Sequence, residues 1–314
     1  MAGATSALAD QVNVPADPIA WSRRARSAIW WSLCGTGLAL VVAIVVWVLE
    51  GVVQSAIPGW SWSIFTQATT GVGGGLANTI VGTFVLMLGV GILAGLVGIG
   101  TGLFLSEMAR PSPLTAVLRS ASEVLSGVPS IVFGYTGYVA LVVGLHWGFS
   151  LLAALIVLSL LVVPYVAKST EIALNQVPLA YREGGEALGM AKTYLLRKIV
   201  MRSAVPGMAT GVIVALAISV GETAPMLYTA GFSNSYPSSA LVHAPVPYLT
   251  YATWTFWNEP TQAVRNLAFD SSVLLVALVL LLVLAARLVV RLTQRYAPER
   301  SRGAPRTVRV RRGA

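Results

Sequence analysis

The segment from Lys168 to Gly231 reads KSTEIALNQVPLAYREGGEALGMAKTYLLRKIVMRSAVPGMATGVIVALAISVGETAPMLYTAG. It places a charged, helix-forming stretch between two long apolar runs, and the second run carries one carboxylate, Glu222. A charged stretch between membrane spans usually meets a partner outside the membrane, whereas a carboxylate within a span usually faces a cavity or a partner. We therefore interpret the charged stretch as a docking surface and the second run as part of a solute path.

The composition of the chain is that of an integral membrane protein. Of its 314 residues, 56% are hydrophobic and only 11% are charged, with a mean hydropathy of +0.75. A soluble protein of this size has about 25% charged residues. The net charge of +9 does not indicate nucleic-acid binding, because the basic residues flank apolar runs and do not alternate with aromatic residues.

Six apolar runs predict an all-α membrane protein with six transmembrane helices. The predicted spans cover about residues 28–49, 79–105, 124–145, 149–167, 208–230 and 269–290. The run at 79–105 has many glycines at near-helical spacing, which predicts close packing against neighbouring helices.

Basic residues predict the orientation of these spans. Arg265 is the one basic residue among 21 that falls on the opposite side from all the others. The positive-inside rule therefore predicts a cytoplasmic N-terminal arm (1–27), a six-span domain (28–292) and a basic cytoplasmic tail (293–314). We expect a multi-pass protein of the cytoplasmic (plasma) membrane with both termini in the cytoplasm.

The charged stretch predicts two short cytoplasmic helices, at about 179–188 and 191–203. Pro178 precedes the first helix, and Pro206 and Gly207 follow the second. Both have a charged face and an apolar face, which suits insertion into a groove on a peripheral partner. The alternative is a pair of interfacial helices that lie on the bilayer.

The order Glu183-Gly184-Gly185, Gly189 and then Ile199 resembles the EAA motif of binding-protein-dependent ABC importer permeases. Two alanines of that motif are replaced here by glycines, and its Leu-Pro ending is replaced by Met201-Arg202. The resemblance implies the MetI-like fold of type I importers, with coupling helices that dock on a separate ATPase. The coupling residues that it implies are Arg182, Glu183, Gly184, Gly185, Ala187, Leu188, Gly189 and Ile199.

Three further motifs are similar to those of phosphate-specific permeases. They are GGGLAN (73–78), SGVPSIVFG (126–134) and GETAP (221–225), and the first favours the PstA-type over the PstC-type subunit. The resemblance implies a permease subunit for inorganic phosphate. Its implied partners are a PstC-type second permease, a PstB-type ATPase dimer and a PstS-type external phosphate-binding protein.

The sequence predicts no cofactor, metal site or enzymatic activity for this chain. The glycines at 71–75 are not followed by the Gly-Lys-Ser/Thr of a nucleotide-binding loop. ATP and Mg²⁺ are therefore expected on the partner ATPase. His146 and His243 stand alone in predicted external loops, and we assign them no ligand role.

Five polar residues are the candidates for the solute path. They are Lys168, Ser126, Ser130, Glu222 and Thr223. The path residues are drawn partly from the resemblance, in which an arginine usually occupies the position of Lys168.

The sequence is compatible with several alternatives. The Glu222 carboxylate could be bonded to Thr223 or to backbone freed by Pro225, and Lys168 could extend to the membrane interface. The family pattern has an arginine three residues before Gly221, where this chain has Ile218. The solute could therefore be another oxyanion, such as sulfate, molybdate or phosphonate. A polytopic membrane enzyme or scaffold is the alternative from a different class.

Overall fold

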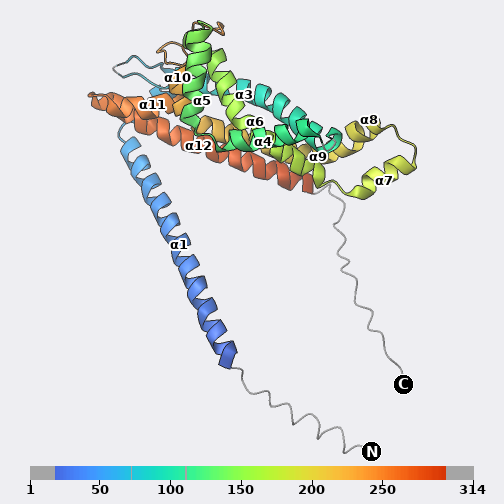
Figure 1. The fold of residues 1–314 in the computed structure, drawn as a ribbon. Coiled ribbons are helices and arrows are strands. Elements are labelled where there is room, and N and C mark those ends of the chain that lie inside the picture. Colours follow the sequence, from blue (N-terminus) through green and yellow to red (C-terminus); the bar gives the residue numbers. More distant parts are fainter. Residues whose placement is uncertain (1–17, 72, 110–111, 295–314) are drawn as a thin grey trace, which may run out of the picture. The chain divides into compact units, whose positions relative to one another are not determined.

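The computed structural model describes residues 18–71, 73–109 and 112–294, and these residues are helical almost throughout (Figure 1). The α-helices are α1 (Pro18–Ala56), α2 (Ser63–Thr66), α3 (Ala77–Leu103), α4 (Pro113–Gly127), α5 (Ser130–Gly137), α6 (Leu151–Asn175), α7 (Leu179–Ala187), α8 (Lys192–Leu195), α9 (Met201–Gly221), α10 (Ala224–Thr229), α11 (Leu249–Thr255) and α12 (Gln262–Gln294). The short π-helical and 3₁₀ segments are η1 (Phe104–Met108), η2 (Tyr138–Gly144), η3 (Leu196–Val200) and η4 (Phe256–Asn258).

The chain divides into two compact units after Gln54. The first unit is formed by most of α1, which is long and apolar enough to cross a membrane from Trp21 to Ala56. This helix begins at Pro18, so the predicted N-terminal arm is partly helical. The second unit contains the remaining helices. Most of the arm (1–17) and of the basic tail (295–314) lies outside the described residues.

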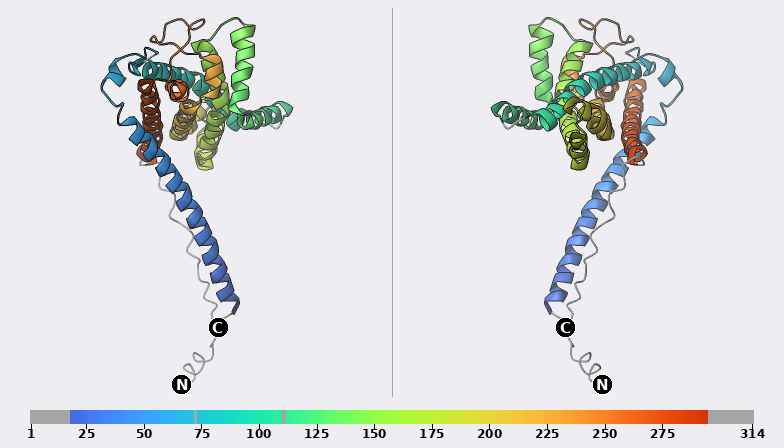
Figure 2. Two further views of the ribbon diagram at one scale, coloured as in Figure 1. Left: turned by 90° about the vertical axis from the view of Figure 1, so that its left-hand side faces the viewer. Right: turned by 90° about the vertical axis from the view of Figure 1, so that its right-hand side faces the viewer.

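Five described helices are long and apolar enough to span a membrane, and a sixth span is counted if one bent pair is a single span. The bent pair replaces the predicted continuous span at 124–145. Here α4 meets α5 and η2 at an angle of 101°, which Figure 2 shows from the side. Pro129 explains the break, because it forces Val128 into an extended conformation (ψ 129°) and has no N–H to donate. The residues predicted as a connection before this span instead form most of α4.

The second predicted cytoplasmic helix is not a separate element. The residues predicted at 191–203 continue through α8, η3 and α9 into the next span, from Lys192 to Gly221. The prediction that Pro206 and Gly207 end the helix is therefore wrong. Gly207 packs so closely on Ala173 of α6 that an added Cβ would lie 2.6 Å from the Ala173 Cβ. This packing sustains the helix despite the missing N–H of the proline.

The same span breaks further along, where the sequence predicted continuity to residue 230. Helix α9 ends at Gly221, Glu222 is extended (ψ 125°), and α10 starts at Ala224. Proline at the second position of a helix has no intrahelical partner to lose, so Pro225 suits the start of α10.

The core of the second unit lies between α3, α6 and α9. Its central cluster is apolar and includes Val90, Leu158 and Ala215. An added Cβ on Gly98 would lie 2.6 Å from the Val166 Cβ, so α3 and α6 can approach this closely only with glycine. The predicted packing role of the glycines in the second span is confirmed at this contact.

Candidate functional site

The first part of the site is the helical hairpin of α7 and α8. The turn between the two helices depends on Gly189, which has a φ of +69°. Its N–H donates to the Glu186 carbonyl at 2.9 Å, and the Met190 N–H donates to the Gly185 carbonyl at 3.0 Å. A glycine in the left-handed region closes a helix in this way at low cost. The spacing of Glu183 to Gly189 is thus explained by a helix followed by its C-terminal cap.

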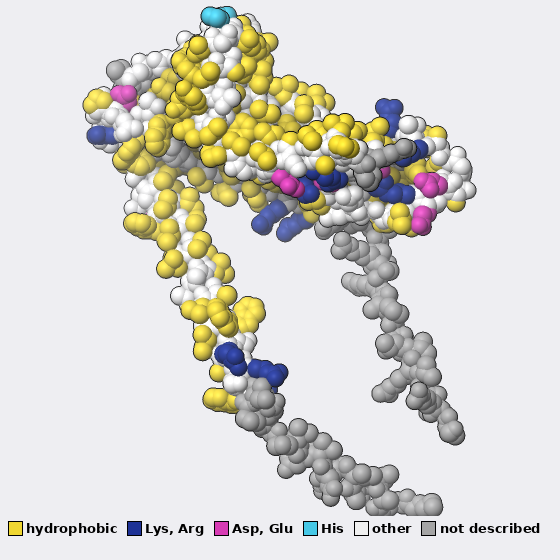
Figure 3. All heavy atoms as spheres, in the orientation of Figure 1, with side chains coloured by type: hydrophobic (Ala, Val, Ile, Leu, Met, Phe, Trp, Pro, Cys, Tyr) yellow, Lys and Arg dark blue, Asp and Glu magenta, His cyan; other side chains and the backbone are white. Residues whose placement is uncertain are grey.

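The outer face of this hairpin is amphipathic and exposed. The exposed large side chains are Leu188 at 77%, Leu179 at 64% and Tyr194 at 55%, and Glu183 and Glu186 are exposed beside them. On the inner face, Gly185 packs against the Leu195 side chain and holds α7 close to α8. Figure 3 shows charged side chains gathered at the end of the second unit where α7 and α8 lie. A surface that mixes apolar and charged groups in this way is suited to a protein partner.

Arg182, one of the predicted coupling residues, points its guanidinium into the protein. It forms an ion pair with Glu107 of η1 at 2.5 Å and donates to the Leu174 carbonyl of α6 at 3.1 Å. The hydrogen bond to Glu107 raises the pKa of Arg182 above its ordinary value, so the guanidinium stays charged. Arg182 therefore ties α7 to the ends of α3 and α6.

The second part of the site is a charged pocket of about 310 Å³ between α4, α6 and η1. Its centre is a carboxylate shared by two cations. Arg119 Nη1 lies 2.5 Å from Glu171 Oε1, and Lys168 Nζ lies 3.3 Å from Glu171 Oε2. The pocket is lined by Leu105, Arg119, Ser122, Glu123, Ser126, Pro164, Tyr165, Ala167, Lys168 and Glu171.

The structure brings two of the predicted path residues together in this pocket and separates the others from it. Lys168 and Ser126 line the pocket. Ser130 is the first residue of α5, and Glu222 and Thr223 lie at the break between α9 and α10. None of these three lines the pocket.

The break between α9 and α10 holds Glu222 through its backbone. The Thr250 hydroxyl donates to the Glu222 carbonyl at 3.3 Å, and the Glu222 N–H donates to Ser219 at 3.3 Å. No hydrogen bond joins the Glu222 carboxylate to Thr223 or to another part of the chain that the structure describes. The alternative of a carboxylate satisfied by Thr223 or freed backbone is not seen in this structure.

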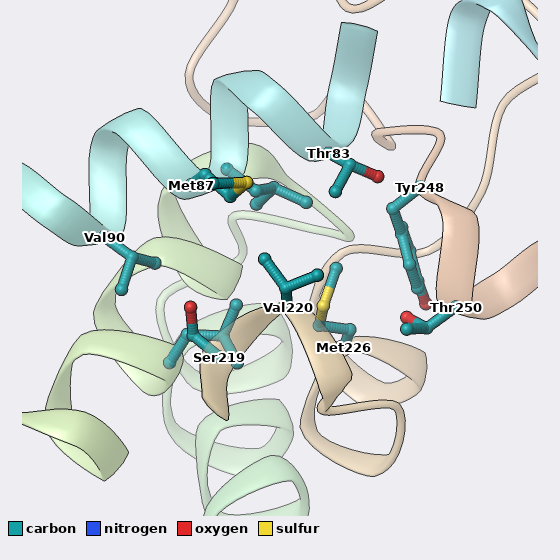
Figure 4. A pocket seen from close by; sticks show the side chains of 10 residues that line it. Thr83, Met87, Val90, Ser219, Val220, Met226, Tyr248 and Thr250 are labelled. Atoms are coloured by element: carbon teal, nitrogen blue, oxygen red, sulfur yellow. The ribbon is translucent and has the colours of Figure 1, made fainter. Parts of the chain in front are cut away.

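A small cavity lies beside this break (Figure 4). Its volume is about 10 Å³, and its polar lining comes from Thr83, Ser219, Tyr248 and Thr250. A cavity of about 10–15 Å³ holds no more than one water molecule. This cavity is therefore too small for a tetrahedral oxyanion, and the charged pocket is the larger of the two spaces.

Comparison with known proteins identifies the family of the chain. Residues 98–302 match the family "Binding-protein-dependent transport system inner membrane component". The chain belongs to this family. It is a permease subunit of an ABC importer, and such membrane components are not themselves enzymes.

Two named relatives cover most of the permease. The "Phosphate transport system permease protein PstA 2" of Mycobacterium bovis is 50% identical over 284 residues, which is 90% of this chain and 94% of the relative. The "Phosphate transport system permease protein PstA" of Yersinia pestis is 35% identical over 280 residues, covering 85% and 93%. The prediction of a PstA-type permease is confirmed by these similarities.

A solved structure confirms the fold. The permease is similar to a chain of the MetNI methionine ABC transporter in an inward-facing conformation, with a TM-score of 0.57 and 20% identity. The similarity covers 69% of this chain and 95% of that chain. The MetI-like fold predicted for the permease is therefore confirmed.

Two of the motifs that carry the resemblance pack against each other in the permease. An added Cβ on Gly134, in SGVPSIVFG, would lie 2.6 Å from the Pro225 Cα of GETAP. Each motif also contains a helix break, after Gly127 and after Gly221. The close packing of Gly134 on Pro225 explains why the first motif has glycine at position 134.

The structure also gives roles to residues that sequence reasoning left unexplained. The buried Asn78 amide donates to the Asn234 carbonyl at 3.1 Å, and its oxygen accepts from the Thr69 N–H at 3.1 Å. It thereby joins two loops far apart in the sequence. The His243 ring lies 2.8 Å from the His146 carbonyl and joins a second pair of loops. Only the asparagine in GGGLAN gave a signal in the sequence.

Arg119 and Glu171 are the functional candidates that sequence reasoning missed. They lie 52 residues apart and meet only because α4 packs against α6. Nothing in the local sequence around either residue predicts the pair.

Proposed function

We propose that this permease translocates inorganic phosphate across the cytoplasmic membrane, as one of two membrane subunits of an ATP-driven importer. The observation that carries the proposal is the 50% identity, over 90% of the chain, to a relative named as a phosphate transport permease. The charged pocket supports it chemically. Arg119 and Lys168 offer the charged N–H donors that oxyanions bind most strongly.

The hairpin of α7 and α8 is proposed to dock on the partner ATPase, a PstB-type dimer that binds ATP and Mg²⁺. Its exposed Leu188 and Tyr194 would enter a groove on that partner. When nucleotide binding moves the ATPase, the Arg182–Glu107 ion pair transmits the movement from α7 to α3. The Arg182 hydrogen bond to Leu174 transmits it to α6.

The other proposed partners act at the membrane and outside it. A PstC-type second permease completes the translocation path, and a PstS-type external binding protein delivers phosphate to the segments between α1 and α3 and between α10 and α12. The distribution of Lys and Arg supports a location in the plasma membrane with both termini cytoplasmic.

One observation favours a second candidate, a permease for another oxyanion such as sulfate, molybdate or phosphonate. Ile218, at the position where the family pattern has arginine, packs against the apolar core of α3 and α6. The permease therefore lacks a cation at that point, and solute selection depends more on the remaining charged groups or on the partner permease.

Competition of uptake distinguishes the two candidates. The permease is expressed with its partner subunits in cells that lack their own phosphate importer, and uptake of labelled phosphate is measured with each unlabelled anion in excess. We expect only phosphate, and not sulfate or molybdate, to abolish the uptake. Uptake that sulfate or molybdate abolishes at lower concentration than phosphate would contradict the proposed solute.

A further inference from the structure

The charged pocket contains a buried carboxylate that the proposed function does not use. The Glu171 side chain is 8% exposed, whereas its partners Arg119 and Lys168 are 43% and 66% exposed. A buried carboxylate is costly unless cations and hydrogen bonds compensate it. Each Glu171 oxygen has a cation: Oε1 faces Arg119 and Oε2 faces Lys168.

The geometry around Glu171 is that of an occupied anion site. Two cations from different helices, α4 and α6, converge on one pair of oxygens. A carboxylate and a phosphate oxygen accept the same charge-assisted hydrogen bonds from guanidinium and ammonium groups. The bond between Arg119 and the Leu105 carbonyl, at 3.2 Å, fixes the guanidinium in place independently of Glu171.

The two cations also retain capacity for a ligand. Lys168 has three N–H donors and makes one hydrogen bond to the described residues, the one to Glu171. The pocket of about 310 Å³ leaves room beside both groups. Its other titratable lining residues are Glu123 and Tyr165.

We propose that Glu171 is the resident counter-ion of an anion site formed by Arg119 and Lys168, and that the transported oxyanion displaces it. While the site is empty, the carboxylate holds both cations and keeps α4 against α6. An arriving oxyanion takes over the hydrogen bonds from Arg119 and Lys168, and Glu171 reclaims them when the anion leaves. The carboxylate therefore weakens binding and speeds release.

The inference rests on the proposed function for the identity of the anion as phosphate, and otherwise on the pocket. The proposal differs from a purely structural role of the ion pair in the direction of the change in anion affinity when Glu171 is removed. If Glu171 competes with the anion, its removal tightens anion binding. If the pair only joins α4 to α6, removal of either partner weakens the protein and tightens nothing.

Phosphate binding to the purified complex tests the displacement directly. The permease is purified with its membrane partner and ATPase but without the external binding protein, and the Kd for labelled phosphate is measured by equilibrium dialysis. Glu171→Gln is expected to lower the Kd about tenfold and Arg119→Gln to raise it about tenfold, the size of one charge-assisted hydrogen bond. In proteoliposomes, Glu171→Gln is also expected to slow turnover, because the anion is released more slowly.

The controls separate displacement from loss of structure. Glu50→Gln removes a carboxylate from α1, outside the pocket, and is expected to leave the Kd unchanged. Glu171→Asp keeps the negative charge and is expected to give a Kd close to that of the unchanged complex. A Glu171→Gln complex that binds phosphate no more tightly than the unchanged complex would overturn the proposal.

The identity of the anion that the unchanged complex binds and transports tests the proposed function separately. If the unchanged complex binds and transports sulfate but not phosphate, the proposed solute is wrong. The same comparison of Kd values, made with labelled sulfate, then still decides whether Glu171 is displaced.

Discussion

Replacement of Arg182 by methionine tests whether movement of the ATPase passes through this side chain. Methionine keeps much of the length of the side chain but removes the ion pair to Glu107 and the hydrogen bond to Leu174. We expect R182M to leave the complex assembled, because the exposed face of α7 is unchanged. The movement of α7 should then no longer be tied to α3 and α6.

The structure gives the size of this effect. Loss of one partner of a fully buried ion pair costs about 3–5 kcal/mol. The Glu107 side chain is 7% exposed but that of Arg182 is 24% exposed. With allowance for solvent screening, we expect a cost of about 2 kcal/mol for the docking of α7 on the bundle. The population with α7 detached then rises roughly thirtyfold.

The assay is the ratio of phosphate uptake to ATP hydrolysis in proteoliposomes. We expect R182M to retain ATP hydrolysis and to lose most of the uptake, and the charge exchange R182E/E107R to recover part of it. The matched control is R202M, which removes an exposed arginine of α9 that has no ion pair among the described residues. An R182M complex with an unchanged ratio of uptake to hydrolysis would refute the transmission through Arg182.

Gly189→Val should abolish coupled uptake while Gly189→Asn largely preserves it, because asparagine tolerates the positive φ and valine does not; equal losses would mean that size, and not φ, limits the turn. Gly98→Ala should lower the free energy of unfolding of the purified permease by about 1–3 kcal/mol, seen as a lower thermal midpoint, because its Cβ meets Val166. Gly100→Ala, with nothing within 4 Å, should leave the midpoint unchanged, and equal shifts would contradict the packing. Asn78→Ala should lower the free energy of unfolding by about 2–4 kcal/mol, because buried hydrogen bonds are lost. An unaltered thermal midpoint would count against the role of Asn78 between the loops.

The sequence predicted the features that depend on local pattern. Apolar length predicted the membrane-spanning helices apart from the breaks at Val128 and Glu222, and the charged stretch predicted the first cytoplasmic helix and its end near Gly189. The close contact of Gly98 with α6 follows from the same kind of local signal.

The features that the sequence did not predict depend on tertiary packing. The break at Val128 and the continuation of the helix through Pro206 both involve proline, and the same residue type ends one helix and is tolerated in another. The difference comes from the contact of α9 with α6, which a single sequence does not reveal. The Arg119–Glu171 pair likewise depends on how α4 folds back against α6.

ATP-driven accumulation of phosphate in proteoliposomes is the most direct test of the central claim. The vesicles contain the permease with its partner permease and ATPase, and receive the external binding protein and labelled phosphate. We expect accumulation against a gradient that requires ATP and stops when this permease is omitted. Equal accumulation without this chain, or ATP hydrolysis with no movement of phosphate, would contradict it.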